Sequence, residues 1–537
     1  MTERWGIPPR GMTQAAVLAA FLSILPFPNA ARSDDSGGGP MGFPSGATLQ
    51  SIVSGESGPG KSSPGKPVRP DWGPRLWSQE GGGETRNPFF AAPPPRKASR
   101  DSSGQTGESV AGSGTFQSSS APPQWDRNFA PNPLAALDYS FSHQPVLANG
   151  RLLLTSTRGQ VLCLDAMTGG TLWHVRLPES VRASGVADEN AFYVVSGSPY
   201  VTAPHMMGYA QTRTIRRGSG PGHLYALSLL SGKILWSAEV PGPVLGSPVL
   251  SGGILWVATG NARLAGYSLE KERKILEMPL FSSAGWSSPL YVHHWIWLSL
   301  EGPTKLVALW PERKRTVWAL TTPPTERLVL FTPTPAFGAM RLVTLFLSVR
   351  KGIPHERLAI ASAVTGHIFH EIPFAEKGES VSLEKVVPPG LPPFARVFEG
   401  AAGAVVAGST AVAASAILGR AIAADIPSGH RFWSVPLPAS PVGSGTVAGL
   451  LVALPLRDRL LLADLASGKT LESRRLDGEP APGSPPIMET TLYLAQKNGR
   501  VRAISLENQR KRIFPSPKPP DLSGGAGDRE KERNGDG

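Results

Sequence analysis

Residues 164–173 read LDAMTGGTLW, which is the end of an apolar strand, a tight turn and a second apolar segment that closes with a tryptophan. This pattern returns along the chain. We take the position four residues before the turn glycine as an anchor, and find five copies that keep the glycine and three that lack it. The eight anchors are Asp165, Ser228, Ser268, Trp310, Ser362, Asp425, Asp464 and Ser505.

The spacing of the anchors identifies the repeat unit. They lie 63, 40, 42, 52, 63, 39 and 41 residues apart, which is a basic period of about 40 residues with three insertions. Such a period fits one four-stranded blade of a β-propeller. Each anchor follows a short apolar strand, with two more strands before it and a fourth after the turn. The sequence therefore predicts an all-β fold, an eight-bladed β-propeller of four-stranded antiparallel blades.

We interpret the recurring residues of the repeat as structural. An Asp or Ser at the strand end accepts backbone N–H groups of the turn, and the glycine adopts positive φ at little cost. A tryptophan eight positions after the anchor has a large apolar area with which to lock neighbouring blades together. The residues concerned are Asp165, Gly169, Trp173, Gly232, Trp236, Trp318, Gly366, Asp425, Gly429, Trp433, Asp464 and Gly468.

One segment tests this interpretation. Residues 401–418 carry no charge over eighteen positions, a length typical of a membrane helix. Aligned to the repeat, they instead give a strand at 404–407, a turn at 408–410 and a strand at 411–415. We therefore predict two propeller strands here.

The chain divides into four predicted regions. Residues 1–31 resemble a signal peptide, because Arg4 and Arg10 precede an apolar run at 15–27. No cysteine lies in this region, so there is no lipobox cysteine for lipid attachment, and an uncleaved anchor is the alternative. Residues 134–517 form the propeller, and residues 518–537 a disordered charged tail. The sequence leaves open how the ring closes and whether 134–142 adds a strand to the last blade.

Residues 32–133 are dominated by Gly, Pro and Ser and are predicted to be a disordered, low-complexity linker. Two aromatic stretches interrupt it, DWGPRLW at 71–77 and NPFFAAPPPRK at 87–97. Each is a candidate docking motif that orders on a partner, although isolated aromatic residues in linkers are usually inert.

Composition limits the chemistry. The chain carries 53 Lys and Arg against 41 Asp and Glu, a net charge of +12 that favours anionic surfaces as partners. Cys163 is the only cysteine, so no intramolecular disulfide can form. We identify no catalytic residue, no metal ligand and no nucleic-acid motif.

The repeat, with its strand followed by D-A-x-T-G-x-x-x-W, resembles the PQQ-like repeat of eight-bladed propellers. That family contains quinoprotein dehydrogenases and the BamB lipoproteins of outer-membrane assembly. The resemblance implies, for the dehydrogenase branch, PQQ and Ca²⁺ held by carboxylate and amide ligands, an Asp base and often a disulfide between adjacent cysteines. The single cysteine excludes that disulfide, and none of the family's catalytic residues maps onto a position in this sequence.

We therefore expect a BamB-like, exported, periplasmic or envelope-associated ring that acts as a non-catalytic scaffold for envelope proteins. It is expected to be monomeric, without cofactor and without nucleic acid. The alternatives are a PQQ-dependent dehydrogenase using calcium, and a propeller that binds carbohydrate or polyanions. Whether the protein is an enzyme stays open.

The candidate contact with a partner is the insertion at 198–222, within the second blade. Loops on a rigid scaffold carry function more often than the scaffold itself. An ordinary solvated insertion is the alternative. The candidate contact residues are Tyr200, Tyr209, Arg213, Arg216 and Arg217.

Overall fold

The computed structural model describes residues 89–90, 122–197, 204–205, 216–217, 220–301, 304–321, 333–350, 353–376, 379 and 403–515. The predicted signal peptide and the charged tail lie outside these residues, as does nearly all of the predicted linker.

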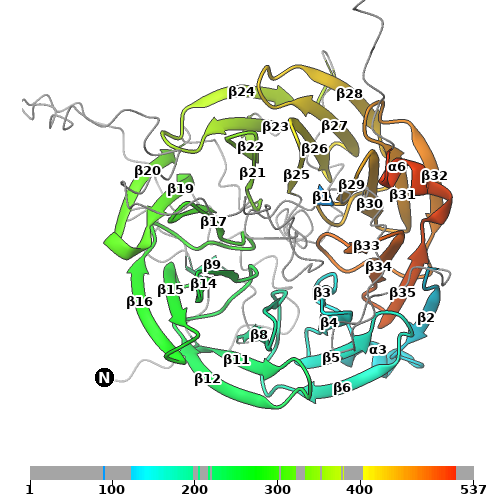
Figure 1. The fold of residues 1–537 in the computed structure, drawn as a ribbon. Coiled ribbons are helices and arrows are strands. Elements are labelled where there is room, and N and C mark those ends of the chain that lie inside the picture. The colour runs from blue at the N-terminus through cyan, green and yellow to red at the C-terminus, as the bar shows by residue number, and fades with distance from the viewer. Residues whose placement is uncertain are drawn as a thin grey trace, which may run out of the picture. The chain divides into compact units, whose positions relative to one another are not determined.

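Eight four-stranded sheets follow one another around a ring (Figure 1). The four strands of each blade pair antiparallel, and in seven blades they follow one another along the chain, with the ribbon of β9 (Pro204–His205) and β10 (Arg216–Arg217) inserted in one of them. One sheet has a fifth strand, β1 (Phe89–Phe90), which pairs in parallel. The prediction of an eight-bladed β-propeller is confirmed. We number the blades 1 to 8 in the order in which their innermost strands occur.

The strands of the first four blades have the following bounds. Blade 1 comprises β3 (Val146–Ala148), β4 (Arg151–Thr155), β5 (Gln160–Asp165) and β6 (Thr171–Arg176), and blade 2 comprises β7 (Val186–Ala187), β8 (Ala191–Ser196), β11 (Gly222–Ser228) and β12 (Ile234–Val240). Blade 3 comprises β13 (Val249–Ser251), β14 (Ile254–Ala258), β15 (Arg263–Ser268) and β16 (Arg273–Pro279), and blade 4 comprises β17 (Leu290–Val292), β18 (Trp295–Ser299), β19 (Thr304–Trp310) and β20 (Arg315–Thr321).

Blades 5 to 7 repeat the arrangement. Blade 5 comprises β21 (Ala336–Gly338), β22 (Arg341–Arg350), β23 (Ile353–Ser362) and β24 (Ile368–Pro373), and blade 6 comprises β25 (Ala404–Ala407), β26 (Thr410–Ser415), β27 (Arg420–Asp425) and β28 (Arg431–Pro436). Blade 7 comprises β29 (Thr446–Ala448), β30 (Leu451–Leu456), β31 (Arg459–Asp464) and β32 (Thr470–Arg475). A one-turn 3₁₀ helix, η1 (Pro311–Arg313), joins β19 to β20.

Blade 8 closes the ring with a strand from the other end of the chain. Its first three strands are β33 (Ile487–Met488), β34 (Thr491–Ala495) and β35 (Arg500–Ser505), and its fourth is β2 (Trp125–Asn128), antiparallel to β35. The fourth strand expected after Ser505 does not form, because the chain there turns into η2 (Glu507–Gln509) and α6 (Arg510–Ile513). The closing strand lies within the segment predicted as linker, and residues 133–138 form helix α3 (Pro133–Asp138) rather than a strand.

The uncharged segment at 401–418 forms strands β25 and β26, so the strand prediction is confirmed. None of the helices in the described residues has the length and apolar character required to cross a bilayer.

A β-bulge recurs at the same point of the repeat. In each of blades 1 to 7 the pairing of the third and fourth strands shifts register between the two residues that precede the anchor. In blade 1 the shift falls between Cys163 and Leu164, and in blade 3 between Gly266 and Tyr267. Because a bulge bends and twists its strand, the outermost strand is turned in the same way in every blade. The bulge shows that Ser268 and Trp310, two of the three anchors without a glycine, belong to the same repeat.

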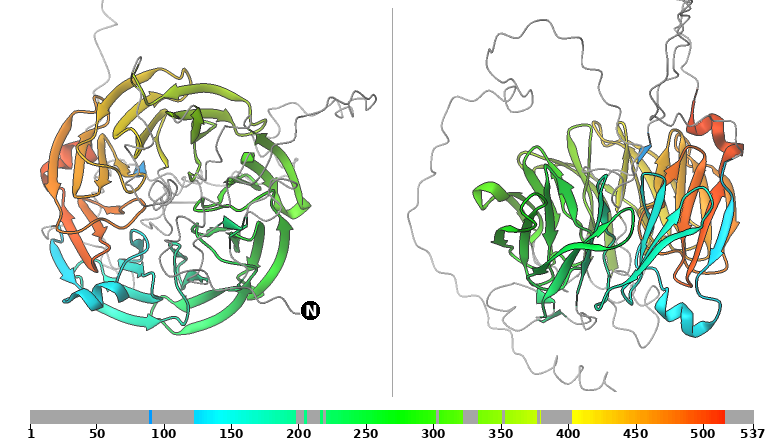
Figure 2. Two further views of the ribbon diagram at one scale, coloured as in Figure 1. Left: turned by 180° about the vertical axis from the view of Figure 1, so that it is seen from behind. Right: turned by 60° about the horizontal axis from the view of Figure 1, so that its bottom comes forward.

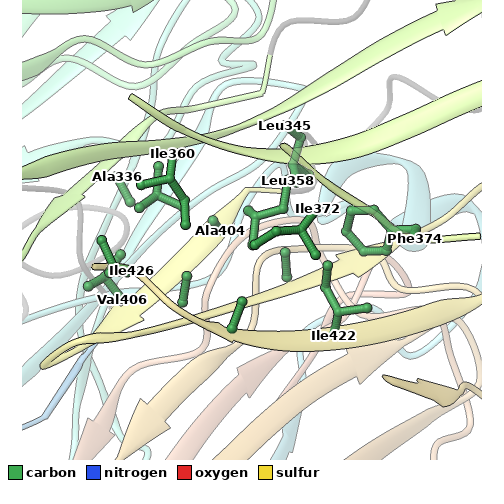
Figure 3. Packing of buried hydrophobic residues seen from close by; sticks show 14 of the residues in the cluster. Ala336, Leu345, Leu358, Ile360, Ile372, Phe374, Ala404, Val406, Ile422 and Ile426 are labelled. Carbon is green, nitrogen blue, oxygen red and sulfur yellow. The ribbon is translucent and has the colours of Figure 1, made fainter. Parts of the chain in front are cut away.

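The hydrophobic core lies between the blades. Alternate residues of a strand point to opposite faces of its sheet, so each blade buries both faces against its neighbours. Between blades 5 and 6, Leu345, Leu358 and Phe374 meet Val406 and Ile422 (Figure 3). All five are buried, and each contributes on the order of 1–3 kcal/mol of transfer free energy. The ring is therefore a stack of apolar interfaces that leaves the strand ends for other roles.

Candidate functional site

The ring has two unlike faces. Because neighbouring strands in a blade are antiparallel, successive connections alternate between the two faces. Connections between the first and second and between the third and fourth strands lie on one face, which we call the turn face. Connections between the second and third strands and between blades lie on the other, the loop face. Helix α3, which leads from β2 to β3, and helix α6, which follows β35, project from opposite faces (Figure 2).

The turn face is closed by tight turns. Between the first two strands of blades 1 and 3 the chain turns through Asn149–Gly150 and Gly252–Gly253, all with positive φ. Such pairs form the short turns whose twist matches that of a hairpin. The repeat glycines form the second set of turns on this face. The turn face therefore has little chain that can adapt to a partner.

All three insertions of the repeat open on the loop face. They are the connections from β8 to β11 (197–221), from β20 to β21 (322–335) and from β24 to β25 (374–403). The first and third account for the two anchor spacings of 63 residues. The spacing of 52 comes partly from 322–335 and partly from the ten-residue strands β22 and β23, whose connection also lies on the loop face. Because the chain varies in length only on this face, the loop face is the candidate interaction surface.

The insertion in blade 2 contains a short two-stranded ribbon. Strand β9 (Pro204–His205) pairs antiparallel with β10 (Arg216–Arg217), so that His205 lies opposite Arg216. The candidate contact residues Arg216 and Arg217 are thus on a two-stranded ribbon within the insertion. Tyr200, Tyr209 and Arg213 lie outside the described residues.

A polar cluster sits where this insertion leaves and re-enters the blade. Glu179 lies in the connection from β6 to β7, Ser196 ends β8, and His223 and Tyr225 lie on β11. One carboxylate oxygen of Glu179 accepts hydrogen bonds from Ser196 Oγ (3.0 Å) and Tyr225 Oη (2.9 Å). Its other oxygen lies 2.9 Å from His223 Nδ1, in an arrangement too bent for a hydrogen bond. We call these four residues the Glu179 clamp.

Strand register explains why the clamp forms. His223 lies opposite Ser196 on one side and opposite Glu239 on the other, so the three residues occupy the same face of blade 2. Tyr225 follows two positions later and shares that face. Burial, together with the hydrogen bond to Glu179, raises the pKa of Tyr225 to about 12, so the phenol stays protonated and remains a donor.

The geometry of the clamp indicates positioning rather than catalysis. The Ser196 hydroxyl donates to the carboxylate and to the carbonyl of His223 (3.2 Å), and neither contact is with the imidazole. Ser196 and His223 therefore each contact the carboxylate of Glu179, and the serine hydroxyl does not contact the imidazole. In nucleophilic catalysis the acid contacts the histidine and the histidine contacts the serine. The clamp ties the two stems of the insertion to the neighbouring connection and so fixes where the insertion stands on the face.

The repeat residues hold the ring together at the turn face. In the turns of blades 1, 6 and 7 the Asp anchor accepts a backbone N–H and a hydroxyl from the residue three positions on, as Asp165 does from Thr168 (2.7 and 2.8 Å), Asp425 from Ser428 and Asp464 from Ser467. The glycine one position later has φ of +68 to +72° in all five copies: Gly169, Gly232, Gly366, Gly429 and Gly468.

Each of these glycines lies under a ring from the preceding blade. A Cβ on Gly232 would come within 2.7 Å of the indole of Trp173, whose Nε1 donates to the carbonyl of Leu229 (3.0 Å). Trp318 lies over Gly366 and Trp433 over Gly468 in the same way, with Nε1 donating to Ala363 (3.0 Å) and Leu465 (2.8 Å). Trp236 packs in the blade 2–3 core beside Tyr193. The glycines thus serve close approach as well as positive φ.

A further set of residues was not recognised from the sequence. A hydroxyl precedes the innermost strand in several blades and accepts the backbone N–H of the equivalent residue in the blade before. Ser184 donates to Ser247 (3.1 Å), Ser247 to Ser288 (2.9 Å) and Ser288 to Thr334 (3.1 Å). Gly403 donates likewise to Ser444 (2.9 Å). The signal is present in the sequence as a small hydroxyl residue before the first strand of several blades, as in GSPV and SSPL.

The described residues offer little redox or metal chemistry. Cys163 is fully buried in β5, and burial raises the pKa of its thiol to about 12, so it is unreactive. Within the described part of the chain, no three or more His, Cys, Asp or Glu side chains gather closely enough to hold a metal ion.

Comparison with known proteins gives one family and several similar folds. The family described as outer membrane protein assembly factor BamB matches residues 111–212 and 198–474. A search of curated proteins finds no match.

Solved structures with a similar fold include two natural proteins and a designed one. BamB from Moraxella catarrhalis is 14% identical, with a TM-score of 0.49 over 71% of this chain and 98% of its own. The computationally designed protein Ika8 is 11% identical, with a TM-score of 0.50 over 68% and 96%. Quinohemoprotein alcohol dehydrogenase from Comamonas testosteroni is 12% identical, with a TM-score of 0.48 over 72% and 76%. At these identities the likeness is one of fold alone.

Proposed function

Because the chain belongs to the family described as outer membrane protein assembly factor BamB, we propose that it is an exported, non-catalytic scaffold. It holds envelope proteins together during outer-membrane assembly, with its loop face as the binding surface. The observation that carries this proposal is that all three insertions of the repeat open on one face of a rigid ring. Scaffolds of this kind place binding loops on a fixed frame.

The two faces support a division of labour. The residues of the turn face hold neighbouring blades together. Its glycines lie under the Trp rings of the preceding blade, and its carbonyls accept hydrogen bonds from the indole N–H groups. The loop face carries the variable chain, and the Glu179 clamp fixes the stems of one insertion. A partner that binds the loop face therefore leaves the interfaces between the blades undisturbed.

A quinone cofactor does not fit the described residues. The Ca²⁺ that accompanies PQQ needs several oxygen ligands, usually including carboxylates. Among the described residues, no three or more His, Cys, Asp or Glu side chains gather closely enough to hold a metal ion. We therefore propose that the ring works without PQQ.

The scaffold proposal is tested in cells by gene deletion and complementation. Loss of the protein is expected to reduce the outer-membrane proteins recovered in the membrane fraction, and the native gene is expected to restore them. A variant in which 198–221 is replaced by a short glycine-containing turn is expected to fail to restore them. Leu230→Ser, at an exposed residue in the turn face of the same blade, is the matched control and is expected to restore them fully.

Thermal unfolding of both purified variants checks that the rings are intact. Unchanged outer-membrane proteins after deletion would contradict the proposal as a whole. If the shortened variant restored the outer-membrane proteins fully, this insertion would not be part of the binding surface. The alternative as a quinoprotein is tested by calorimetric titration of PQQ with Ca²⁺ into the full chain. No binding is expected, and tight stoichiometric binding would overturn the proposal that the ring is non-catalytic.

A further inference from the structure

One short strand does not belong to the eightfold pattern. Strand β1 (Phe89–Phe90) lies 35 residues or so before the closing strand and pairs in parallel with β29, the innermost strand of blade 7. Phe89 lies opposite Val447 and Phe90 opposite Ala448, so blade 7 has a fifth strand on the side that faces the channel. Figure 1 shows β1 between β25 and β29 on the inner side of the ring.

The innermost strand lies at the edge of its sheet in every blade except blade 7, where β1 lies outside it. The edge strand of a sheet is a template for another strand. Blades 6 and 7 differ from blades 4 and 5 in the side chains of the innermost strand. Their innermost strands read AVVA and TVA, whereas those of blades 4 and 5 read LYV and AFG. Tyr291 and Phe337 are half-buried at the middle of those two strands. Small side chains around β29 leave its backbone accessible to a further strand.

The sequence around β1 suits it to this role. Pro88 precedes the two phenylalanines and Pro93 begins a run of three prolines. Proline has no N–H to donate, so it restricts a strand to the residues between 88 and 93. Proline also favours an extended backbone, so the flanks lose little conformational entropy when the segment docks as a strand. The strand that can pair is therefore short.

We propose that the inner edge of blade 7 is a strand-binding site and that its ligand is the chain's own segment 87–97. Main-chain hydrogen bonds to β29 hold the segment in the channel, as in other cases of strand addition to a sheet edge. Because β29 runs from the loop face to the turn face and β1 is parallel to it, the segment before Phe89 joins β1 from the loop-face end. An extended peptide that entered the channel at blade 7 would have to displace this resident strand.

The test is disulfide trapping in the full chain. Phe90→Cys with Ala448→Cys places two thiols at paired positions, and the native Cys163 does not compete because it is buried with a raised thiol pKa. Mild oxidation is expected to link residues 90 and 448 in most molecules, as read by mass spectrometry of the linked peptides. The matched control is Phe90→Cys with Ser251→Cys, since Ser251 is the third residue of the innermost strand of blade 3 as Ala448 is of blade 7.

Failure of the 90–448 link, or an equal yield of the 90–251 link, would overturn the proposal. A second measurement requires no cysteine. Phe90→Pro is expected to raise amide exchange at residues 446–448 roughly tenfold, as for the loss of about one net hydrogen bond. Phe116→Pro, in the same Gly- and Ser-rich region, is the control and is expected to leave exchange unchanged. Unchanged exchange in Phe90→Pro would also overturn the proposal. Neither readout depends on a binding partner, so each is independent of the scaffold function.

Discussion

At two interfaces between neighbouring blades, which we call seams, a ring of one blade lies over a turn glycine of the next, but the ring comes from a different kind of residue. At the closing seam Trp125 of blade 8 lies over Gly169 of blade 1, and its Nε1 donates to Ala166 (3.0 Å). At the seam between blades 5 and 6, His370 lies over Gly429, and its Nε2 is 3.0 Å from the carbonyl of Pro427. Trp125 belongs to a blade whose other three strands lie at the far end of the chain, whereas His370 comes from the blade that directly precedes Gly429 in the sequence. The contact is therefore set by position in the ring rather than by position in the sequence.

The seams differ in how charge is used. Blade 8 is closed by a surface network in which Asp126 bonds Arg500 (2.7 Å) and Arg502 (3.0 Å), and Asp477 bonds both arginines. The seam between blades 5 and 6 has surface ion pairs too, since Arg431 and Arg420 of blade 6 pair with Glu376, which follows β24 of blade 5. In addition it buries one carboxyl, that of Glu356, which accepts a hydrogen bond from Ser415. The difference between the seams is this carboxyl, which has no cationic partner among its hydrogen bonds.

Removing the closing tryptophan should have the largest effect. Trp125→Ala is expected to lower the free energy of unfolding by about 3–5 kcal/mol, as for other large aromatic truncations. It also frees β2 from blade 1, so the denaturant dependence of unfolding should become shallower as blade 8 opens first. Trp433→Ala, at the seam between blades 6 and 7, is the control. Trp433→Ala should lower the free energy of unfolding by a similar amount without changing its dependence on urea concentration. If the two variants showed the same urea dependence, Trp125 would not have a special role in closing the ring.

The buried carboxyl should make one seam weaken as pH rises. Burial raises the pKa of Glu356 from 4.5 to about 7. Below pH 4.5 the group is protonated in both states, whereas between 4.5 and 7 the unfolded chain releases a proton that the native ring retains. Stability should therefore fall across this window by at most roughly 3 kcal/mol.

The comparison for this prediction is the difference in unfolding free energy between native protein and Glu356→Gln, measured from pH 4 to pH 8. Glu356→Gln removes the titration, so the native ring should lose stability relative to it as pH rises. Glu371→Gln, at the half-exposed Arg357–Glu371 pair of the same blade, should leave the pH profile unchanged. A constant difference between native and Glu356→Gln would contradict the assignment.

His370, which lies over Gly429, should contribute less to the free energy of unfolding than a tryptophan in the equivalent position. His370→Ala is expected to cost about 1 kcal/mol, because a smaller ring buries less apolar area and its polar contact is largely exposed. Chemical denaturation alongside Trp433→Ala measures the ratio directly. If His370→Ala lost as much unfolding free energy as Trp433→Ala, the size of the ring over the glycine would not determine the strength of the contact.

The surface network should contribute least and respond to salt. Asp126→Asn is expected to cost about 0.5–1 kcal/mol at low ionic strength and less at high salt, because its partners are exposed. Glu371→Gln at a single pair provides the reference. If Asp126→Asn lost the same unfolding free energy at low and high salt, the network would stabilise the closed ring by packing and not by ion pairing.

The sequence predicted the parts of the ring that repeat and missed those that do not. Glycine and aspartate at fixed spacing gave the turns, because positive φ and side-chain acceptors are local requirements. The closing strand escaped prediction because WDRN at 125–128 has neither a preceding hairpin nor a turn glycine, and its partner β35 is remote. The hydroxyls before the innermost strands were missed because each bonds across blades. The Glu179 clamp likewise joins residues 17 to 46 positions apart.

The closure of blade 8 also sets an order of events. Asp126 and its partner Arg500 are 374 residues apart, so β2 is made early and has no partner strand until β35 has been synthesised. Until then the nascent chain has an open ring with an unpaired blade edge at each end, which is the condition in which neighbouring chains exchange strands. The final pairing has a high loop-closure cost and makes formation of the last blade a late step in folding.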